Sequence, residues 1–215
     1  MASLYEKRRT LALGEGGREY LQKRQEISQA AGRVFKRKGL SATNVNDIAT
    51  EAEVDRATLY YYFGSKQEIF EEVVTAAVTN NAKGAEVIRL GPGTGPDKLR
   101  NLIVSLMVSY AAHYPFLYVF IQENLTQLGK TRPEWSKAMR DLNHQYEASI
   151  IGIIQDGIAD GTLSATGDAK TIAYGLLGML GWTNRWFSPE DSSQSAEEIG
   201  NTFADVFLGG LIPRG

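Results

Sequence analysis

The chain has 215 residues, of which 43% are hydrophobic and 22% charged, so it can bury a core and has the composition of an ordinary soluble protein. It contains no cysteine, which excludes disulfides and thiolate metal sites. The net charge of −2 argues against a nucleic-acid partner. The charge is unevenly distributed, however: residues 1–66 carry twelve Lys or Arg and eight Asp or Glu, whereas residues 67–215 carry eleven Lys or Arg and seventeen Asp or Glu. A basic N-terminal segment on an otherwise acidic protein suits local contact with phosphates. The alternative is that the charges are simply scattered over the surface without a function.

Residues 1–17 are predicted to form a flexible arm, because Gly14, Gly16 and Gly17 disfavour helix. The basic run at residues 7–9 either reaches DNA or is a solvated tail, and solvated tails are the commoner case. The arm lacks the apolar run of a signal peptide, and no stretch of the chain nears the roughly eighteen apolar residues that suggest a membrane span. We therefore expect a cytoplasmic protein with no membrane partner.

A helix is expected from about residue 18 to residue 38, with an inward apolar stripe and with Arg24, Arg33 and Arg37 on its outer side. Gly39 is well placed as its C-terminal cap. Residues 43–66 are then typical of two short helices with a tight joint. The hydroxyl group of Thr43 can cap the first of these helices.

The second short helix presents polar and aromatic side chains rather than a broad apolar face. It is expected over residues 56–62, with Asp55 as its cap and with Leu59 and Phe63 pointing inward. The remaining surface is shared by Arg56, Thr58, Tyr60, Tyr61 and Tyr62. A helix-turn-helix lays its second helix into the major groove of DNA with side chains of this kind. A small helical subdomain with half-buried tyrosines is the alternative.

The rest of the chain also predicts helices. Ser65 and Glu68 form a capping-box pattern at the start of a long helix, and Gly91–Pro96 is typical of a linker. Further helices are predicted over residues 97–113, 116–128, 133–161, 168–186 and from 195 on. The predicted fold class is all-α: an N-terminal three-helix helix-turn-helix domain, residues 18–66, plus a larger C-terminal helical domain for ligand binding and dimerisation, residues 67–215.

A longer pattern around the second short helix is more specific than a generic helix-turn-helix. The run Val54-Asp-Arg-Ala-Thr-Leu-Tyr-Tyr-Tyr-Phe-Gly-Ser-Lys-Gln-Glu-Ile-Phe70 resembles the DNA-binding domain of the TetR family of repressors. The similarity covers roughly residues 24–74. It implies DNA contacts by Thr43, Asn44, Arg56, Ala57, Thr58, Tyr60, Tyr61 and Lys66.

The same resemblance implies two kinds of DNA contact. Phosphates would be held by Thr43, Tyr61 and Lys66, which position the domain on the duplex. Base edges would be read from the groove by Arg56, Ala57, Thr58 and Tyr60, with Arg56 as the best candidate for a guanine. Tyr62 stands where many relatives have histidine.

The last two predicted helices are typical of a dimer interface. Three glycines of the 168–186 helix cost helix stability unless another helix packs closely over them, namely Gly175, Gly178 and Gly181. In the TetR family the final two helices pair with their symmetry mates, which implies a homodimer here with an interface at Gly175, Gly178, Phe203 and Phe207. A dimer would read a palindromic operator. Packing of these faces within the chain is the alternative.

The middle helices, residues 97–160, would hold an effector pocket if the family pattern applies. The candidate lining residues are aromatic, although such stripes are usually plain core: Tyr110, Phe120, Trp135, Tyr146 and Trp182. The 174–211 segment is similar to TetR-type regulators of fatty-acid and sterol breakdown, which respond to acyl-CoA thioesters. This similarity implies a small apolar effector, such as an acyl-CoA, in a tunnel with cations such as Lys130, Arg132 or Arg185 at its mouth.

No arrangement of residues for catalysis stands out. The two histidines, His113 and His144, lie in no nucleophile or metal-ligand spacing. We therefore predict no enzyme activity, no metal and no cofactor. The predicted function is a dimeric, ligand-responsive transcriptional regulator, a repressor that an effector releases from double-stranded DNA. The alternative is a small-molecule binding or scaffolding protein that does not bind an operator.

Overall fold

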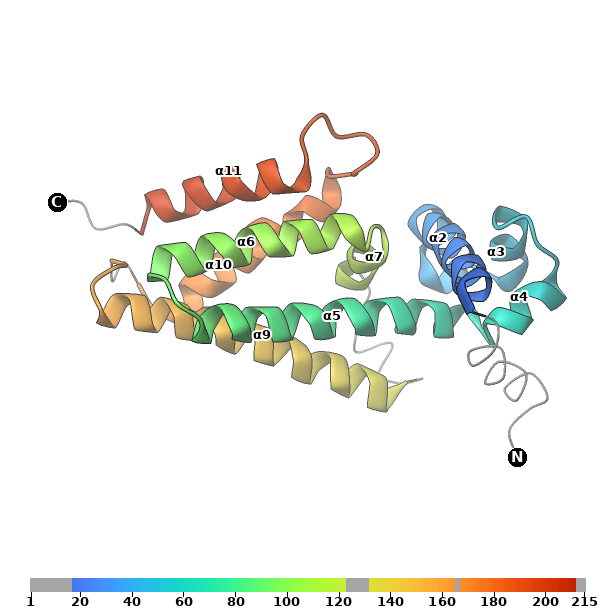
Figure 1. Cartoon of the computed structure of the whole chain (residues 1–215), viewed down its shortest axis with the longest axis horizontal. Helices are drawn as coiled ribbons and strands as arrows, with labels where there is room; N and C mark the ends of the chain where they lie inside the picture. The colour runs from blue at the N-terminus through green and yellow to red at the C-terminus, as the bar shows by residue number, and fades with distance from the viewer. Residues whose placement is uncertain (1–16, 123–131, 165–166, 212–215) are drawn as a thin grey trace. The chain divides into compact units, whose positions relative to one another are not determined.

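The computed structural model describes residues 17–122, 132–164 and 167–211, and across these ranges all regular secondary structure is helical (Figure 1). The predicted all-α class is therefore confirmed. The chain forms two compact units. The first unit comprises the residues up to Val74 together with Pro115–Phe120, and the second comprises Thr75–Tyr114 and the residues from Ile121 on. The first unit thus ends later than predicted and gains a segment that we expected in the second.

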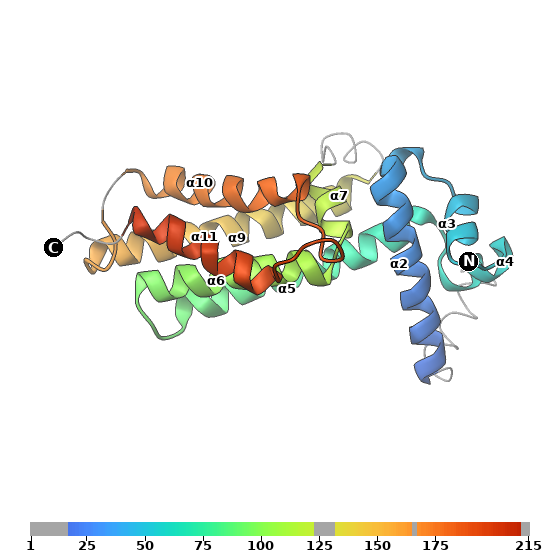
Figure 2. The ribbon, with the colours of Figure 1, turned by 90° about the horizontal axis from the view of Figure 1, so that it is seen from above.

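In the first unit, α2 (Gly17–Ala42), α3 (Val45–Glu51) and α4 (Arg56–Tyr62) gather around the start of α5 (Lys66–Leu90) (Figure 2). The backbone of α2 breaks at Gly39, whose φ of 76° lies in the left-handed region that glycine tolerates, close to the predicted helix end. The core of the unit consists of fully buried aliphatic and aromatic side chains, among them Ile27, Phe35, Ile48, Leu59, Phe63, Ile69 and Phe70.

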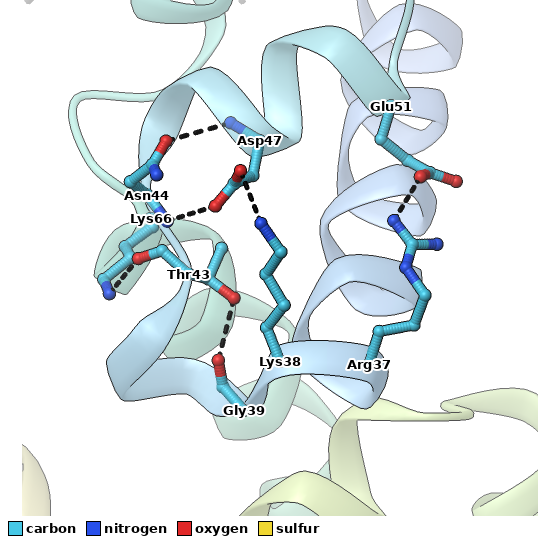
Figure 3. Close-up of polar contacts among 8 residues, drawn as sticks. All are labelled: Arg37, Lys38, Gly39, Thr43, Asn44, Asp47, Glu51 and Lys66. Atoms are coloured by element: carbon cyan, nitrogen blue, oxygen red, sulfur yellow. Dashed lines mark hydrogen bonds and ion pairs between the residues drawn. The ribbon is translucent and has the colours of Figure 1, made fainter.

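The first cap of the helix-turn-helix differs from the prediction. Asn44 caps α3, because its side chain accepts a hydrogen bond from the backbone N–H of Asp47 at 3.0 Å, and the Asp47 carboxylate accepts the Asn44 N–H at 3.0 Å in return. The predicted Thr43 cap is therefore wrong: the Thr43 hydroxyl group instead donates to the carbonyl of Gly39 at 2.8 Å (Figure 3). Both residue types are good caps, and they stand one position apart.

The caps of α4 and α5 are close to the predictions. Asp55 caps α4 through a 2.6 Å bond from the Thr58 N–H, as expected. At the start of α5, the Ser65 hydroxyl group accepts the Glu68 N–H at 3.1 Å. The Glu68 carboxylate accepts the N–H of Gly64 at 2.9 Å, one residue before the partner that a capping box uses.

The segment Pro115–Phe120 packs into the first unit, although its neighbours in sequence belong to the second. It forms most of α7 (Phe116–Gln122), which we expected in the effector domain. The ring of Phe116 lies edge-on to Phe35 at 5.9 Å and stacks on Phe70 at 6.3 Å between centroids. A Cβ built on Gly32 of α2 would lie 2.7 Å from the Phe116 ring, so only glycine admits this ring so close to α2. The predicted remainder of this helix, residues 123–128, lies outside the described residues.

The second unit contains α6 (Gly95–Ala112), α9 (Pro133–Ala159), α10 (Ala169–Gly181), the 3₁₀ turn η1 (Trp182–Arg185) and α11 (Ala196–Gly209). The predicted linker is shorter than expected. Thr94 caps α6 by a capping box with Asp97, so Gly95 and Pro96 lie in the first turn of the helix. The helix α11 packs against α6, and a Cβ built on Gly200 would lie 2.9 Å from the backbone of Val104.

Among the described residues, no single helix has the length and apolarity of a membrane span. The pair α6 and α7 meets both conditions only when taken together, across a bend of 104°.

The turn between α3 and α4 generates a prediction on stability. Glu53 has a φ of 53°, and all the other described residues with positive φ are glycines. Replacing Glu53 with glycine removes about 1–2 kcal/mol of left-handed strain and adds about 0.5–1 kcal/mol of unfolded-state entropy. We expect Glu53→Gly to raise the free energy of unfolding by about 0.5–1 kcal/mol in urea titrations. Glu53→Ala is the control, since it removes the charge and keeps the Cβ; an equal gain in both variants would assign the effect to charge.

Candidate nucleic-acid interface

The helix α4 has one buried side and one side that is open to solvent. Leu59 is fully buried, as is Phe63 at the C-terminal cap, which places the predicted inward pair in the core. The predicted groove-facing residues lie on the open part of the helix: Arg56 and Ala57 are exposed, and Thr58 and Tyr60 are half-buried. The side chains predicted to read bases therefore stay together at the solvent-facing surface of the first unit.

The guanidinium group of Arg56 contacts Tyr60, which lies one turn further along α4. Its Nη2 donates to the Tyr60 hydroxyl group at 3.4 Å, and its Cζ lies 5.7 Å from the centroid of the Tyr60 ring. A guanidinium group carries five N–H donors in a planar fork, of which this contact uses one. The remaining fork has the geometry that pairs with the O6 and N7 atoms of guanine.

The other two tyrosines of α4 pack against α2. The rings of Tyr61 and Tyr62 lie 5.8 Å and 4.9 Å from the ring of Tyr20, and 5.0 Å from each other. Burial raises the pKa of the Tyr62 hydroxyl group above its ordinary value, with Tyr61 as the second cause. Tyr62 is therefore turned toward α2. An open groove of about 580 Å³ lies beside this cluster, lined by Glu19, Tyr20, Gln22, Lys23, Glu26, Thr58, Tyr61 and Tyr62.

Two of the residues that are predicted to contact phosphates form hydrogen bonds within the protein. Lys66 donates from Nζ to the carbonyls of Leu40 at 2.7 Å and Ser41 at 3.0 Å, and also to the carbonyl of Thr43 (Figure 3). An ammonium group has three N–H donors, so these carbonyls occupy all of them. Thr43 is 2% exposed and its hydroxyl group points to Gly39. These bonds close the α2–α3 corner, and the phosphate contacts of Thr43 and Lys66 stay predictions.

Basic residues of α2 also form ion pairs with acidic residues of α3. Glu51 of α3 accepts hydrogen bonds from Arg33 at 2.7 Å and Arg37 at 2.6 Å, and Lys38 pairs with Asp47 at 2.7 Å. The bonds from Arg37 and then Arg33 lower the pKa of Glu51 from 4.5 to about 2. Because this carboxylate titrates at a lower pH when folded, its contribution to stability is present above pH 4.5 and is lost as the pH falls toward 2.

The residues predicted to line an effector pocket are divided between the two units. Tyr110, Trp135 and Tyr146 belong to the second unit, whereas Phe120 belongs to the first. Burial of its hydroxyl group, and secondly the nearby Tyr110, raise the pKa of Tyr146 well above its ordinary value. Trp182 is 62% exposed in the single chain, and its place in a ligand pocket stays a prediction. Lys130, expected at the mouth of the tunnel, lies outside the described residues.

The predicted dimer residues lie on surfaces that the chain itself leaves open. Gly175 and Gly178 of α10 are exposed, and no described atom lies within 4 Å of a Cβ built on either of them. Phe203 and Phe207 of α11 are half-buried. Nearby large apolar side chains are also exposed, namely Tyr174 at 46%, Trp182 at 62%, Trp186 at 52% and Val206 at 68%.

The sequence and the fold both match known proteins. Residues 27–73 match the family model described as bacterial regulatory proteins of the tetR family, and residues 92–211 match the tetracyclin repressor-like C-terminal domain. The chain is 29% identical over 192 residues to the HTH-type transcriptional repressor KstR2 of Mycolicibacterium smegmatis, which covers 88% of this chain and 90% of that protein.

Two solved structures share the fold. The ketosteroid transcriptional regulator KstR2 of Mycobacterium tuberculosis superposes with a TM-score of 0.80 at 22% identity, covering 89% of this chain and 95% of that one. The regulator AibR, solved in complex with isovaleryl coenzyme A and operator DNA, superposes with a TM-score of 0.66 at 16% identity, covering 86% and 97%. Since the family models together span both units and the second alone covers more than half of the chain, the protein belongs to the TetR family of bacterial transcriptional regulators.

Proposed function

We propose that this protein is a repressor that binds a palindromic operator through α4 as a homodimer and leaves it when a small apolar effector binds to the second unit. One observation carries the proposal: Arg56 and Ala57 are exposed, and Thr58 and Tyr60 half-buried, on a helix whose opposite side is anchored in the core. Membership of a family of DNA-binding regulators supports it, as does the name of KstR2 as a repressor. The site of action would be the cytoplasm. No comparable observation favours a scaffold without operator binding.

The proposed homodimer rests on the unpartnered faces of α10 and α11. Glycines in a helix interior cost about 1 kcal/mol each relative to alanine. Gly175 and Gly178 have no close contact within the described chain that would compensate for this cost. A second helix that packs closely over them would compensate. The exposed Trp182, Trp186 and Val206 supply apolar area for the same contact.

The proposed effector class rests on similarity and on the aromatic interior of the second unit. AibR, which shares this fold, binds isovaleryl coenzyme A, and KstR2 is described as a ketosteroid regulator. In this chain the half-buried Trp135 donates from Nε1 to the Thr75 hydroxyl group at 2.9 Å, Tyr110 is buried, and Tyr146 is half-buried with its hydroxyl group withdrawn from water. An acyl-CoA thioester whose acyl chain enters this region is the ligand that we propose.

Replacing Arg56 tests the reading of bases. We expect Arg56→Ala to weaken operator binding by about 1–3 kcal/mol and to relax discrimination at one base pair, because the fork that pairs with guanine is lost. Titrations with the operator, with single-base variants and with random DNA measure this effect. Equal losses on the operator and on random DNA would contradict base reading and would assign Arg56 to a phosphate.

Charging the exposed face of α11 tests the dimer. We expect Val206→Glu to shift the protein toward monomer in light scattering at micromolar concentration and to weaken operator binding, because a buried unpaired carboxylate costs several kcal/mol at an interface. Val87→Glu is a matched control, since Val87 of α5 is 71% exposed and Val206 is 68% exposed. Dissociation by Val87→Glu, with Val206→Glu still dimeric, would move the interface to α5.

Thermal unfolding with acyl-CoAs of increasing chain length tests the effector class. A ligand present at about one hundred times its dissociation constant adds about 2.7 kcal/mol to the stability of the state that binds it. We expect stabilisation that depends on chain length and a parallel loss of operator binding. Free coenzyme A is the control, because it carries the same phosphates without the acyl chain. Absence of stabilisation at every chain length would remove acyl-CoAs from consideration.

A further inference from the structure

The side chain of Arg24 is much less exposed to solvent than those of Arg33 and Arg37, which lie on the same helix α2. Its side chain is 12% exposed, whereas those of Arg33 and Arg37 are 50% and 56% exposed. We expected all three on the outer side of α2, and for Arg24 that expectation is wrong. A charge that is withdrawn from water in this way needs partners that compensate for its lost hydration.

The partners of Arg24 come from α4 and α5. Its Nη1 donates to the carbonyl of Tyr62, the last residue of α4. Its Nε donates to one carboxylate oxygen of Glu72 at 3.2 Å and its Nη2 to the other, which forms a bidentate pair. The guanidinium carbon lies 3.9 Å from the centroid of the Phe63 ring. One side chain of α2 therefore contacts both the end of α4 and the first turns of α5.

These contacts lie at the C-terminal end of α4, which the hydrogen bonds within the helix do not stabilise. The last carbonyls of a helix have no partner within the helix, and a cation at that end is favourable. A helix of seven residues is too short to be stable alone, so its direction is set by what it touches. Leu59 fixes the depth of α4, and Arg24 fixes the position of its C-terminal end relative to α5.

We infer that Arg24, held in place by Glu72, is a positioning residue for operator recognition: it sets the direction of α4 without contacting DNA. This inference rests on the proposed role of α4 as the reading helix. The competing role for a basic residue in this domain is a phosphate contact, and the two roles differ in the effect of Glu72. A positioning arginine needs Glu72, whereas a phosphate-binding arginine would be released by its loss.

The experiment measures the affinity of the full-length protein for the operator and for random DNA at several salt concentrations. The variants are Arg24→Met, which keeps an unbranched apolar stem over Phe63, and Glu72→Gln, which keeps the size of the side chain. Arg37→Met is the matched control, because Arg37 lies on the same helix and pairs with Glu51 of α3. Thermal unfolding of each variant fixes a working temperature at which all of them are folded.

We expect Arg24→Met and Glu72→Gln each to lower operator affinity about tenfold, the scale of one charged hydrogen bond, and to lower the ratio of operator to random-DNA affinity. The salt dependence on random DNA should keep the wild-type slope in Arg24→Met, since no phosphate contact is lost. Arg37→Met should keep the wild-type affinity ratio.

Three results would overturn the inference. Tighter binding of Glu72→Gln to both DNAs would show an arginine freed to bind phosphate. An unchanged affinity ratio in Arg24→Met and Glu72→Gln would show that α4 does not need this pair. An equal fall of the ratio in Arg37→Met would show that any lost pairing of α2 suffices. A wild-type protein that does not distinguish the operator from random DNA would refute the proposed function itself, whereas the other results leave that function intact.

Discussion

Burial of Leu59 and Phe63 is the contact on which the proposed DNA-reading surface depends. A seven-residue helix is unstable in isolation, and full burial of a leucine or phenylalanine side chain contributes on the order of 1.5–3 kcal/mol. Both side chains are fully buried, so the packing of α4 is carried by residues that do not face the solvent. Arg56 and Ala57 are exposed and therefore contribute little to this packing. If α4 reads bases as proposed, these two residues can vary with the operator while the buried residues beneath them stay constant.

The two units are joined by more than one stretch of chain. The helix α5 runs without a break through the boundary between Val74 and Thr75. The chain leaves the second unit again after Tyr114, contributes Pro115–Phe120 to the first, and returns at Ile121. Within the first unit, the ring of Phe116 packs against Phe35 of α2 and Phe70 of α5.

The sequence predicted the local features well and the distant ones poorly. The caps at Asp55 and Ser65, and the inward placement of Leu59, follow from spacings within one or two turns, and the structure has all of them. The choice of Asn44 over Thr43 depends on a helix register that differs by one residue. The partners of Lys66 lie 23–26 residues away, and those of Arg24 lie 38–48 away. Long basic side chains reach many alternative acceptors, so composition and periodicity could not select these contacts.

The contact of Phe116 with Phe35 and Phe70 also governs how the molecule can be dissected. A fragment that ends within α5 would contain all the helices of the helix-turn-helix but would lack Pro115–Phe120. The side of Gly32, Phe35 and Phe70 that Phe116 covers would then face water as an apolar patch, which favours self-association. The first unit is therefore not continuous in sequence: a single cut cannot excise it, and a chimaera that transplants it must carry the distant aromatic segment along.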